Sequence, residues 1–168
     1  MRTHSVRIAL AAVVLAMALS GMTPRTFAQD TTSSDPVVGT WKLDLDKSVM
    51  NRAGGAPVHP TRPATRVFAV EGDGYRMSVS GDGGTAARAY FARFDGKEYP
   101  DPHGPGKDEV AIHWRLNPYL VVRLVKMNGT PTEYATYAVS SDGNVLTTTS
   151  WDPATPEYHN VQVYERQK

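Results

Sequence analysis

Six apolar or aromatic side chains stand on stretches in which apolar and polar residues alternate. They are Tyr75, Met77, Tyr90, Ile112, Trp114 and Tyr137. A buried tyrosine combines an apolar ring with a hydroxyl group that needs a hydrogen-bond partner. If these side chains lined one cavity, that cavity would suit a small hydrophobic or amphiphilic ligand. The alternative is that they fill the core and leave no cavity.

Four basic side chains lie on the same kind of stretch and would change this chemistry if they faced inward. They are Arg88, His113, Arg115 and Arg123. An inward arginine can hold a carboxylate through two parallel hydrogen bonds. However, His113 alternates with Trp114, and Arg123 alternates with Val122 and Leu124, so the opposite face is the more apolar one. We therefore expect the basic side chains to face solvent.

Other kinds of site lack the residues they need. A catalytic zinc requires three protein ligands held together, but His59, His103 and His159 are widely separated and no His-x-His pair exists. The chain has no cysteine and no Gly-x-Ser-x-Gly motif, so nucleophiles of those two kinds are absent. The sequence predicts no catalytic residue, no metal ligand and no cofactor.

The elements that carry these residues are predicted to be short strands joined by tight turns. We expect strands at 37–43, 66–70, 75–80, 86–94, 97–99, 108–116, 119–127, 132–139, 145–151 and 159–166. Asn128-Gly129 predicts a two-residue hairpin turn, because both turn positions need positive φ. The segment 44–65 predicts a long loop with one helical turn near 46–51, and this loop would gate the interior.

Short and even connections favour pairing between consecutive strands. A sheet of this length must protect its edges, and closure into a barrel does so. We therefore predict an all-β fold, an antiparallel up-and-down β-barrel of about eight to ten strands. The last strand would return beside the first. A two-sheet sandwich is the alternative architecture.

The first 28 residues have the layout of a secretory signal peptide. Arg2 and Arg7 precede the apolar run from Ile8 to Leu19, and small residues lead to a cleavage site after Ala28, or alternatively after Ser20. The prediction is a signal peptide at 1–28, a disordered lead-in at 29–36 and a barrel at 37–168. A Sec-type signal implies a periplasmic or secreted protein with no stable membrane insertion after cleavage.

Charge and composition restrict the partners further. Loss of Arg2, Arg7 and Arg25 would reduce the 18 basic residues to 15, against 17 acidic ones. A nearly neutral domain has no electrostatic footprint for nucleic acid. The expected partner is a small hydrophobic molecule.

Gly39-Thr40-Trp41 resembles the Gly-x-Trp signature of lipocalin-like (calycin) barrels, in which an arginine near the end of the barrel often accompanies the tryptophan. Here that arginine would be Arg166. The segments 94–100 and 139–147 extend the resemblance to secreted bacterial lipocalin-like domains of unknown function. The resemblance implies structural roles for Gly39, Trp41 and Arg166, and a non-enzymatic carrier. It leaves two alternatives: a small enzyme of the isomerase or cyclase type with Tyr and His inside the barrel, and an envelope protein-contact domain with a filled core.

Overall fold

The computed structural model describes residues 35–51, 55–81, 86–101 and 108–168. The predicted signal peptide and residues 29–34 of the predicted lead-in lie outside this part of the chain. Within it, no helix is long and apolar enough to cross a membrane.

Ten strands form the fold within the described residues, and their positions follow the predicted ones closely. They are β1 (Gly39–Val49), β2 (Thr65–Glu71), β3 (Gly74–Ser80), β4 (Ala86–Ala92), β5 (Asp95–Pro100), β6 (Glu109–Asn117), β7 (Leu120–Met127), β8 (Thr130–Val139), β9 (Val145–Trp151) and β10 (His159–Arg166). All the pairings between them are antiparallel. The prediction of an all-β up-and-down barrel is confirmed.

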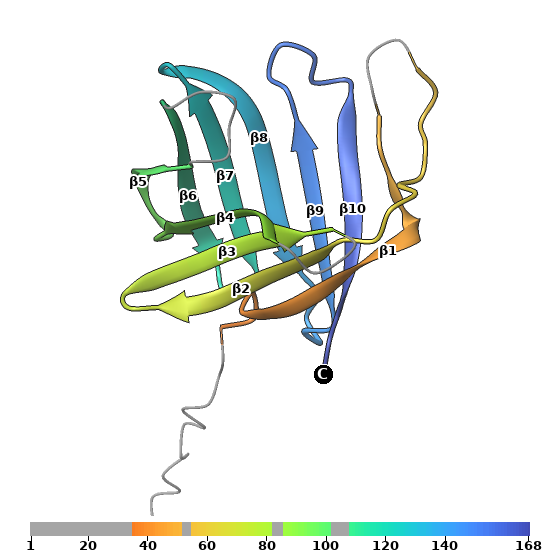
Figure 1. Ribbon diagram of the computed structural model, residues 1–168, viewed down its shortest axis with the longest axis horizontal. Coiled ribbons are helices and arrows are strands. Elements are labelled where there is room, and N and C mark those ends of the chain that lie inside the picture. The colour runs from red at the N-terminus through yellow and green to blue at the C-terminus, as the bar shows by residue number, and fades with distance from the viewer. Residues whose placement is uncertain (1–34, 52–54, 82–85, 102–107) are drawn as a thin grey trace, which may run out of the picture. The chain divides into compact units, whose positions relative to one another are not determined.

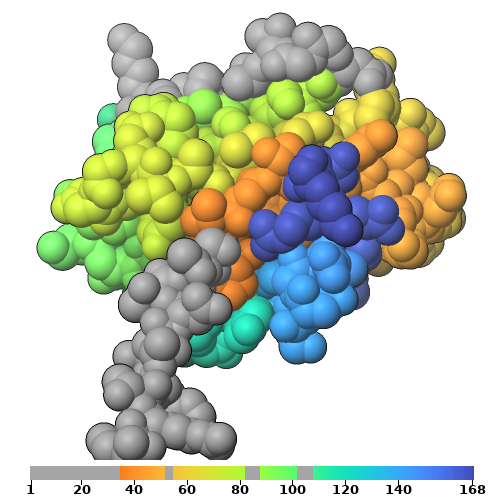
Figure 2. Space-filling view, turned by 90° about the horizontal axis from the view of Figure 1, so that it is seen from below, coloured from red at the N-terminus to blue at the C-terminus, as the bar shows by residue number. Residues whose placement is uncertain are grey.

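The strands form one sheet in the order β4-β3-β2-β1-β10-β9-β8-β7-β6-β5. β1 pairs with β10, with Trp41 opposite Arg166, so the first and last strands meet as predicted. Figure 1 shows β6 to β10 running side by side while β2, β3 and β4 cross them. Figure 2, seen from below, shows the last residues in dark blue against β1 in orange.

The sheet has two ends, β4 and β5, and this seam is closed by side chains. Arg88 on β4 forms ion pairs with Asp101, just after β5, and with Glu109 at the start of β6. Further along, the ring of Phe91 contacts the ring of Tyr99 edge-on, with centroids 5.9 Å apart. The barrel is therefore nearly closed, with backbone ladders everywhere except at this seam.

β1 is longer than predicted, because its ladder with β10 resumes after an irregularity between Asp44 and Val49. The Asp44 carboxylate accepts hydrogen bonds from the backbone N–H groups of Asp46 and Lys47 across this irregularity. The predicted helical turn at 46–51 is therefore wrong. Asp44 thus accepts backbone hydrogen bonds as an aspartate does in a turn, but within a strand.

Both residues of the Asn128-Gly129 turn have positive φ, 50° and 78° respectively. This is the conformation that a two-residue hairpin requires to match the twist of its strands. The turn sets the pairing beside it, Met127 opposite Thr130. An irregularity between Val125 and Lys126 then shifts the register, so that Leu124 lies opposite Tyr134 and Arg123 opposite Ala135.

The prediction of which face of β6 and β7 lies inward is wrong. His113 and Arg123 are 0% and 3% exposed and face the interior, whereas Trp114 is 36% exposed on the opposite face. Ile112 is also buried, but it lies outside the main core cluster. The inward charges are tolerated because acidic partners surround them, which is the condition for burying an ionised side chain.

Candidate functional site

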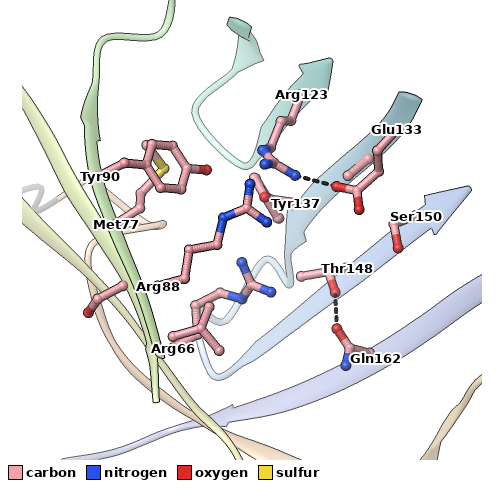
Figure 3. A pocket seen from close by; sticks show the side chains of 13 residues that line it. Arg66, Met77, Arg88, Tyr90, Arg123, Glu133, Tyr137, Thr148, Ser150 and Gln162 are labelled. Carbon is pink, nitrogen blue, oxygen red and sulfur yellow. Dashed lines mark hydrogen bonds and ion pairs between the residues drawn. The ribbon is translucent and has the colours of Figure 1, made fainter. Parts of the chain in front are cut away.

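A cavity of about 120 Å³ lies between β2–β4 and β7–β10. Figure 3 shows the side chains that line it. Those with polar or aromatic groups are Arg66, Ser78, Arg88, Tyr90, Arg123, Glu133, Tyr137, Thr148, Ser150 and Gln162. Pockets for drug-sized ligands usually measure roughly 300–1,000 Å³, and an engineered cavity of about 150 Å³ binds benzene. The cavity is therefore suited to a small molecule or to one end of a larger one.

Arg66 brings to this cavity a charge that no carboxylate of the described residues neutralises. Its guanidinium carbon lies 5.3 Å from the ring centre of Tyr137 and 5.4 Å from that of Tyr164. Its Nε atom is buried, and no hydrogen-bond partner for it exists among the described residues. Nor does a carboxylate of this part of the chain form an ion pair with Arg66. Because arginine stays protonated in proteins, the cavity wall carries a positive charge at this point.

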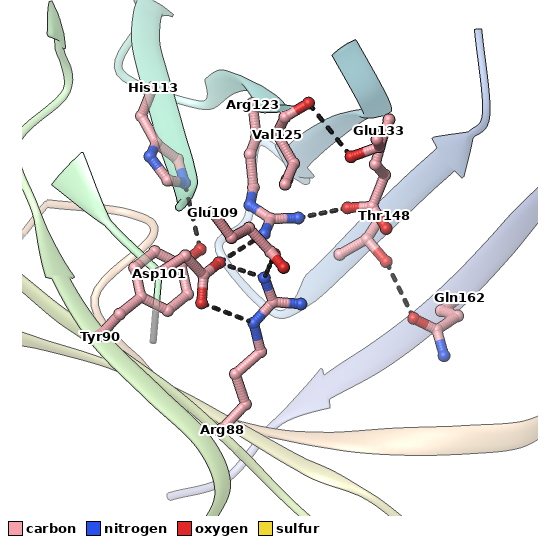
Figure 4. Close-up of polar contacts among 11 residues, drawn as sticks. Arg88, Tyr90, Asp101, Glu109, His113, Arg123, Val125, Glu133, Thr148 and Gln162 are labelled. Atoms are coloured by element: carbon pink, nitrogen blue, oxygen red, sulfur yellow. Dashed lines mark hydrogen bonds and ion pairs between the residues drawn. The ribbon is translucent and has the colours of Figure 1, made fainter. Parts of the chain in front are cut away.

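The other two arginines of the cavity wall belong to a buried ion network, which Figure 4 shows. Arg123 donates to Asp101 at 2.9 Å and also to Glu133. Arg88 donates through Nε to Asp101 at 3.1 Å and through Nη2 to Glu109 at 3.0 Å. Asp101 is fully buried and receives both guanidinium groups. These two arginines are thus neutralised by protein carboxylates, in contrast to Arg66.

His113 lies beside the network and is in contact with Tyr90. The Tyr90 hydroxyl oxygen is 3.3 Å from His113 Nε2, and His113 Nδ1 has no hydrogen-bond partner within the described residues. Burial, followed by the positive charges of Arg123 and Arg88, lowers the pKa of His113 from 6.5 to about 3. Burial raises the pKa of Tyr90. At neutral pH both groups are therefore uncharged.

One end of the barrel is closed by Trp41 and its neighbours. The guanidinium carbon of Arg166 lies 4.0 Å from the Trp41 ring centre, and Arg166 Nη1 donates to the Val38 carbonyl at 2.7 Å. A Cβ at Gly39 would overlap Arg166 Nη1, and Gly39 has a φ of 147°. The indole N–H of Trp41 donates to the Val37 carbonyl at 3.0 Å. A cation stacked on a buried indole contributes about 0.5–2 kcal/mol.

Asp35, from the predicted lead-in, extends this closure. Its carboxylate pairs with Arg115 at 2.6 Å and accepts a hydrogen bond from the Tyr75 hydroxyl at 2.7 Å. The Tyr75 ring stacks on Phe94 with centroids 4.3 Å apart. Arg115 is therefore an internal ion-pair partner, and its predicted solvent-facing orientation is wrong.

The six predicted lining residues fall into three places. Met77, Tyr90 and Tyr137 line the cavity. Tyr75 lies at the closed end of the barrel, stacked on Phe94. Ile112 and Trp114 occupy the face of β6 opposite to His113 and do not reach the cavity.

The inward orientation of the charged residues that distinguish this cavity was not predicted from the sequence. Arg66 alternates with Phe68 along β2, which is a weak sign of an inward side chain, and both in fact face the interior. Arg88 and Arg123 were expected to face solvent, and that expectation is wrong. Asp101 stands just after a short strand, where no periodicity indicates its direction. Within the described residues, no group of three His, Cys, Asp or Glu side chains could hold a metal ion.

No family model and no curated protein sequence matches the chain. Solved structures with similar folds exist. A fatty acid binding protein of Schistosoma mansoni in complex with arachidonic acid has a TM-score of 0.59 at 15% identity, covering 79% of this chain and 97% of that one. Secretory abundant heat soluble protein 4 of Ramazzottius varieornatus has a TM-score of 0.60 at 12% identity, covering 80% of this chain and 97% of that one.

A fatty acid-binding protein from brain tissue of Drosophila melanogaster is also similar, with a TM-score of 0.55 at 19% identity, covering 77% of this chain and 98% of that one. At such low identities the likeness concerns the fold. The chain therefore shares its barrel architecture with these proteins.

Proposed function

We propose that this protein is a non-enzymatic binding protein that holds a small amphiphilic molecule with an acidic head group inside the barrel. The observation that carries the proposal is Arg66, a cavity-lining cation without an ion-pair partner among the described residues. A carboxylate would supply both the missing charge and a hydrogen-bond acceptor for the guanidinium group. The fatty acid-binding neighbours add support from the fold alone.

The cavity limits the size of this ligand. A volume of about 120 Å³ accommodates an acidic head group with a short apolar chain. Met77, Tyr90 and Tyr137 supply apolar surface next to the charged wall. A long-chain fatty acid would have to displace side chains or extend out of the cavity.

A fluorescence displacement experiment tests the proposal. Anilinonaphthalene sulfonate, an anionic probe that brightens in apolar surroundings, should bind saturably and be displaced by hexanoate better than by hexanol. The variant Arg66→Gln should weaken hexanoate binding by about 10-fold to 100-fold, because a hydrogen bond to a charged group contributes about 1.5–3 kcal/mol. Arg76→Gln is the matched control, because Arg76 pairs with Glu71 in an exposed position. Absence of saturable, displaceable binding would reject the proposal.

The alternative of an enzyme that uses Tyr90 and His113 is less well supported. General acid–base catalysis is most effective when the pKa of the group lies near the working pH. The pKa of His113 is lowered to about 3 and that of Tyr90 is raised, so both move away from neutrality. This pair is better suited to a fixed hydrogen bond than to proton transfer at neutral pH.

We also propose that the protein is exported. The support is the sequence: basic residues at positions 2 and 7, the apolar run from Ile8 to Leu19, and small residues before position 29. Mass spectrometry of protein recovered from the periplasm or culture medium should find an N-terminus at Gln29. Retention of the whole chain in the cytoplasm, with Met1 or Arg2 still present, would contradict export.

A further inference from the structure

The outward face of β6 to β10 carries three cross-strand rows of uncharged side chains. One row is Trp114, Val122, Thr136, Thr149 and Val161. The second is Ile112, Leu124, Tyr134 and Trp151, and it ends at His159 on β10. The third is Leu120, Ala138, Thr147 and Val163. These rows contain no Asp, Glu, Lys or Arg, whereas the inward face of the same strands holds Arg115, Arg123 and Glu133. We define the three rows together as the outer apolar face.

The outer apolar face is partly open to solvent. Trp114 is 36% exposed, and Leu116, which continues β6 next to it, is 62% exposed. Ile112 and Leu124 of this face are buried, with 4% and 7% exposure. Tyr134 and Trp151 stack with ring centroids 5.9 Å apart and give the face a rigid aromatic pair. Contiguous apolar surface of this kind is typical of protein interaction sites.

Ion pairs border the outer apolar face on two sides. Lys126 of β7 pairs with Glu98 of β5 at 3.0 Å, and Lys47 of β1 pairs with Glu165 of β10 at 2.9 Å. An apolar centre surrounded by a polar rim is the usual arrangement of a protein–protein interface. The first border carries one charge of each sign. At the second, Lys47 also pairs with Asp44 at 2.8 Å, so both signs are present on both sides. When two copies meet, a positive group of one rim can face a negative group of the other.

We infer that the outer apolar face is the interface of a homodimer, in which a second copy of this chain packs its β6–β10 sheet against the first. Two-fold dimers use the same surface on both subunits, and an uncharged centre with a rim of both signs satisfies that requirement. A bilayer surface fits less well, because helices and patches that bind anionic lipid present an excess of Lys and Arg.

The area of the outer apolar face agrees with a dimer of moderate strength. Strands about 4.8 Å apart and rows about 6.8 Å apart give a projected area on the order of 400 Å². Stable interfaces bury roughly 800 Å² on each partner, of which the centre is apolar and the rim polar. The three rows would therefore form the centre, and the bordering ion pairs would complete the contact.

Sedimentation velocity over a concentration series tests the dimer. The weight-average sedimentation coefficient should rise between about 5 and 500 μM, as expected for a micromolar dissociation constant. Val122→Glu places a charge in the central row and should raise the dissociation constant at least about 10-fold. Val67→Glu on β2 is the matched control, because Val67 is a partly exposed valine that lies outside the outer apolar face. Its dissociation constant should equal that of the unmodified protein.

A second variant keeps the test decisive if Val122→Glu fails to fold, as judged by circular dichroism. Thr136→Glu replaces an already polar residue in the same row and should also weaken association. A protein that stays monomeric throughout the series would overturn the inference, even if it bound to neutral vesicles. Association that persists unchanged in folded Val122→Glu or Thr136→Glu protein would also overturn it, since the contact would then lie elsewhere.

Discussion

At the scale of single residues, His113 is held neutral by burial and by two nearby guanidinium groups. Its pKa is about 3 in the folded protein and returns to an ordinary value near 6.5 on unfolding. Between these two values the unfolded chain binds a proton at this position that the folded protein does not. By linkage, the free energy of unfolding therefore falls as the pH decreases from 6.5 toward 3.

We predict that replacing His113 with Gln removes this pH dependence. In the unmodified protein His113 should contribute a loss of up to about 1.4 kcal/mol per pH unit below pH 6.5, which His113→Gln should lack. Urea unfolding at several pH values for both proteins measures the difference in slope, and the remaining histidines are common to both. Parallel pH profiles would show that His113 titrates normally in the folded protein.

Charged residues limited what could be predicted about individual side chains. The more apolar face of β6 and β7 was expected to line the interior, and this choice put Trp114 inside and His113 outside. The structure has the opposite orientation, because Asp101 and Glu133 accept hydrogen bonds from Arg123 in the interior. These three residues are separated in the sequence, so no local pattern indicates that they meet. Met77, Tyr90 and Tyr137 were assigned to the interior correctly. The clearest signal was that of Met77, whose strand alternates strictly between apolar and polar residues.

At the scale of elements, the turn between β7 and β8 depends on positive φ at Asn128 and Gly129. We predict that Gly129→Ala lowers the free energy of unfolding by about 1–2 kcal/mol, the cost of a left-handed conformation for a residue with a Cβ. A Cβ at Gly129 would meet no atom within 4 Å, so the effect should come from the backbone alone. Chemical denaturation measures it.

Gly81→Ala is the matched control for this prediction. A Cβ at Gly81 also meets nothing within 4 Å, but this glycine is not among those with positive φ. Its replacement by alanine should leave stability unchanged or raise it slightly, by restricting the unfolded chain. Equal losses in the two variants would mean that the turn conformation is not the cause.

Element positions were predictable because period-two alternation and glycine-rich turns bound each strand. The exception was the end of β1, where a polar stretch with little alternation suggested a loop. Long-range pairing with β10 and the hydrogen bond from Val163 N–H to the Ser48 hydroxyl at 2.9 Å make it a strand. Such pairing over more than a hundred residues leaves no local trace in the sequence.

At the scale of the whole molecule, closure of the barrel could be predicted because ten strands without covering helices must otherwise expose two long edges. The cavity volume could not, because it depends on how Arg66, Arg88 and Arg123 share the interior with three carboxylates and two tyrosines. The outer apolar face follows from the same arrangement. Because charged side chains occupy inward positions of β6 to β8, apolar side chains of these strands lie on the outward face.

The seam between β4 and β5 allows the same barrel to be built with a different chain connectivity. Pro36 and Arg166 are already neighbours, since the Arg166 guanidinium donates to the Pro36 carbonyl at 2.5 Å. A circularly permuted gene that fused these ends and opened the chain at Phe94 would run through all ten strands in spatial order, from β5 to β4. Every backbone ladder would survive, and the new termini would emerge where the native sheet has its only two free margins among the described strands.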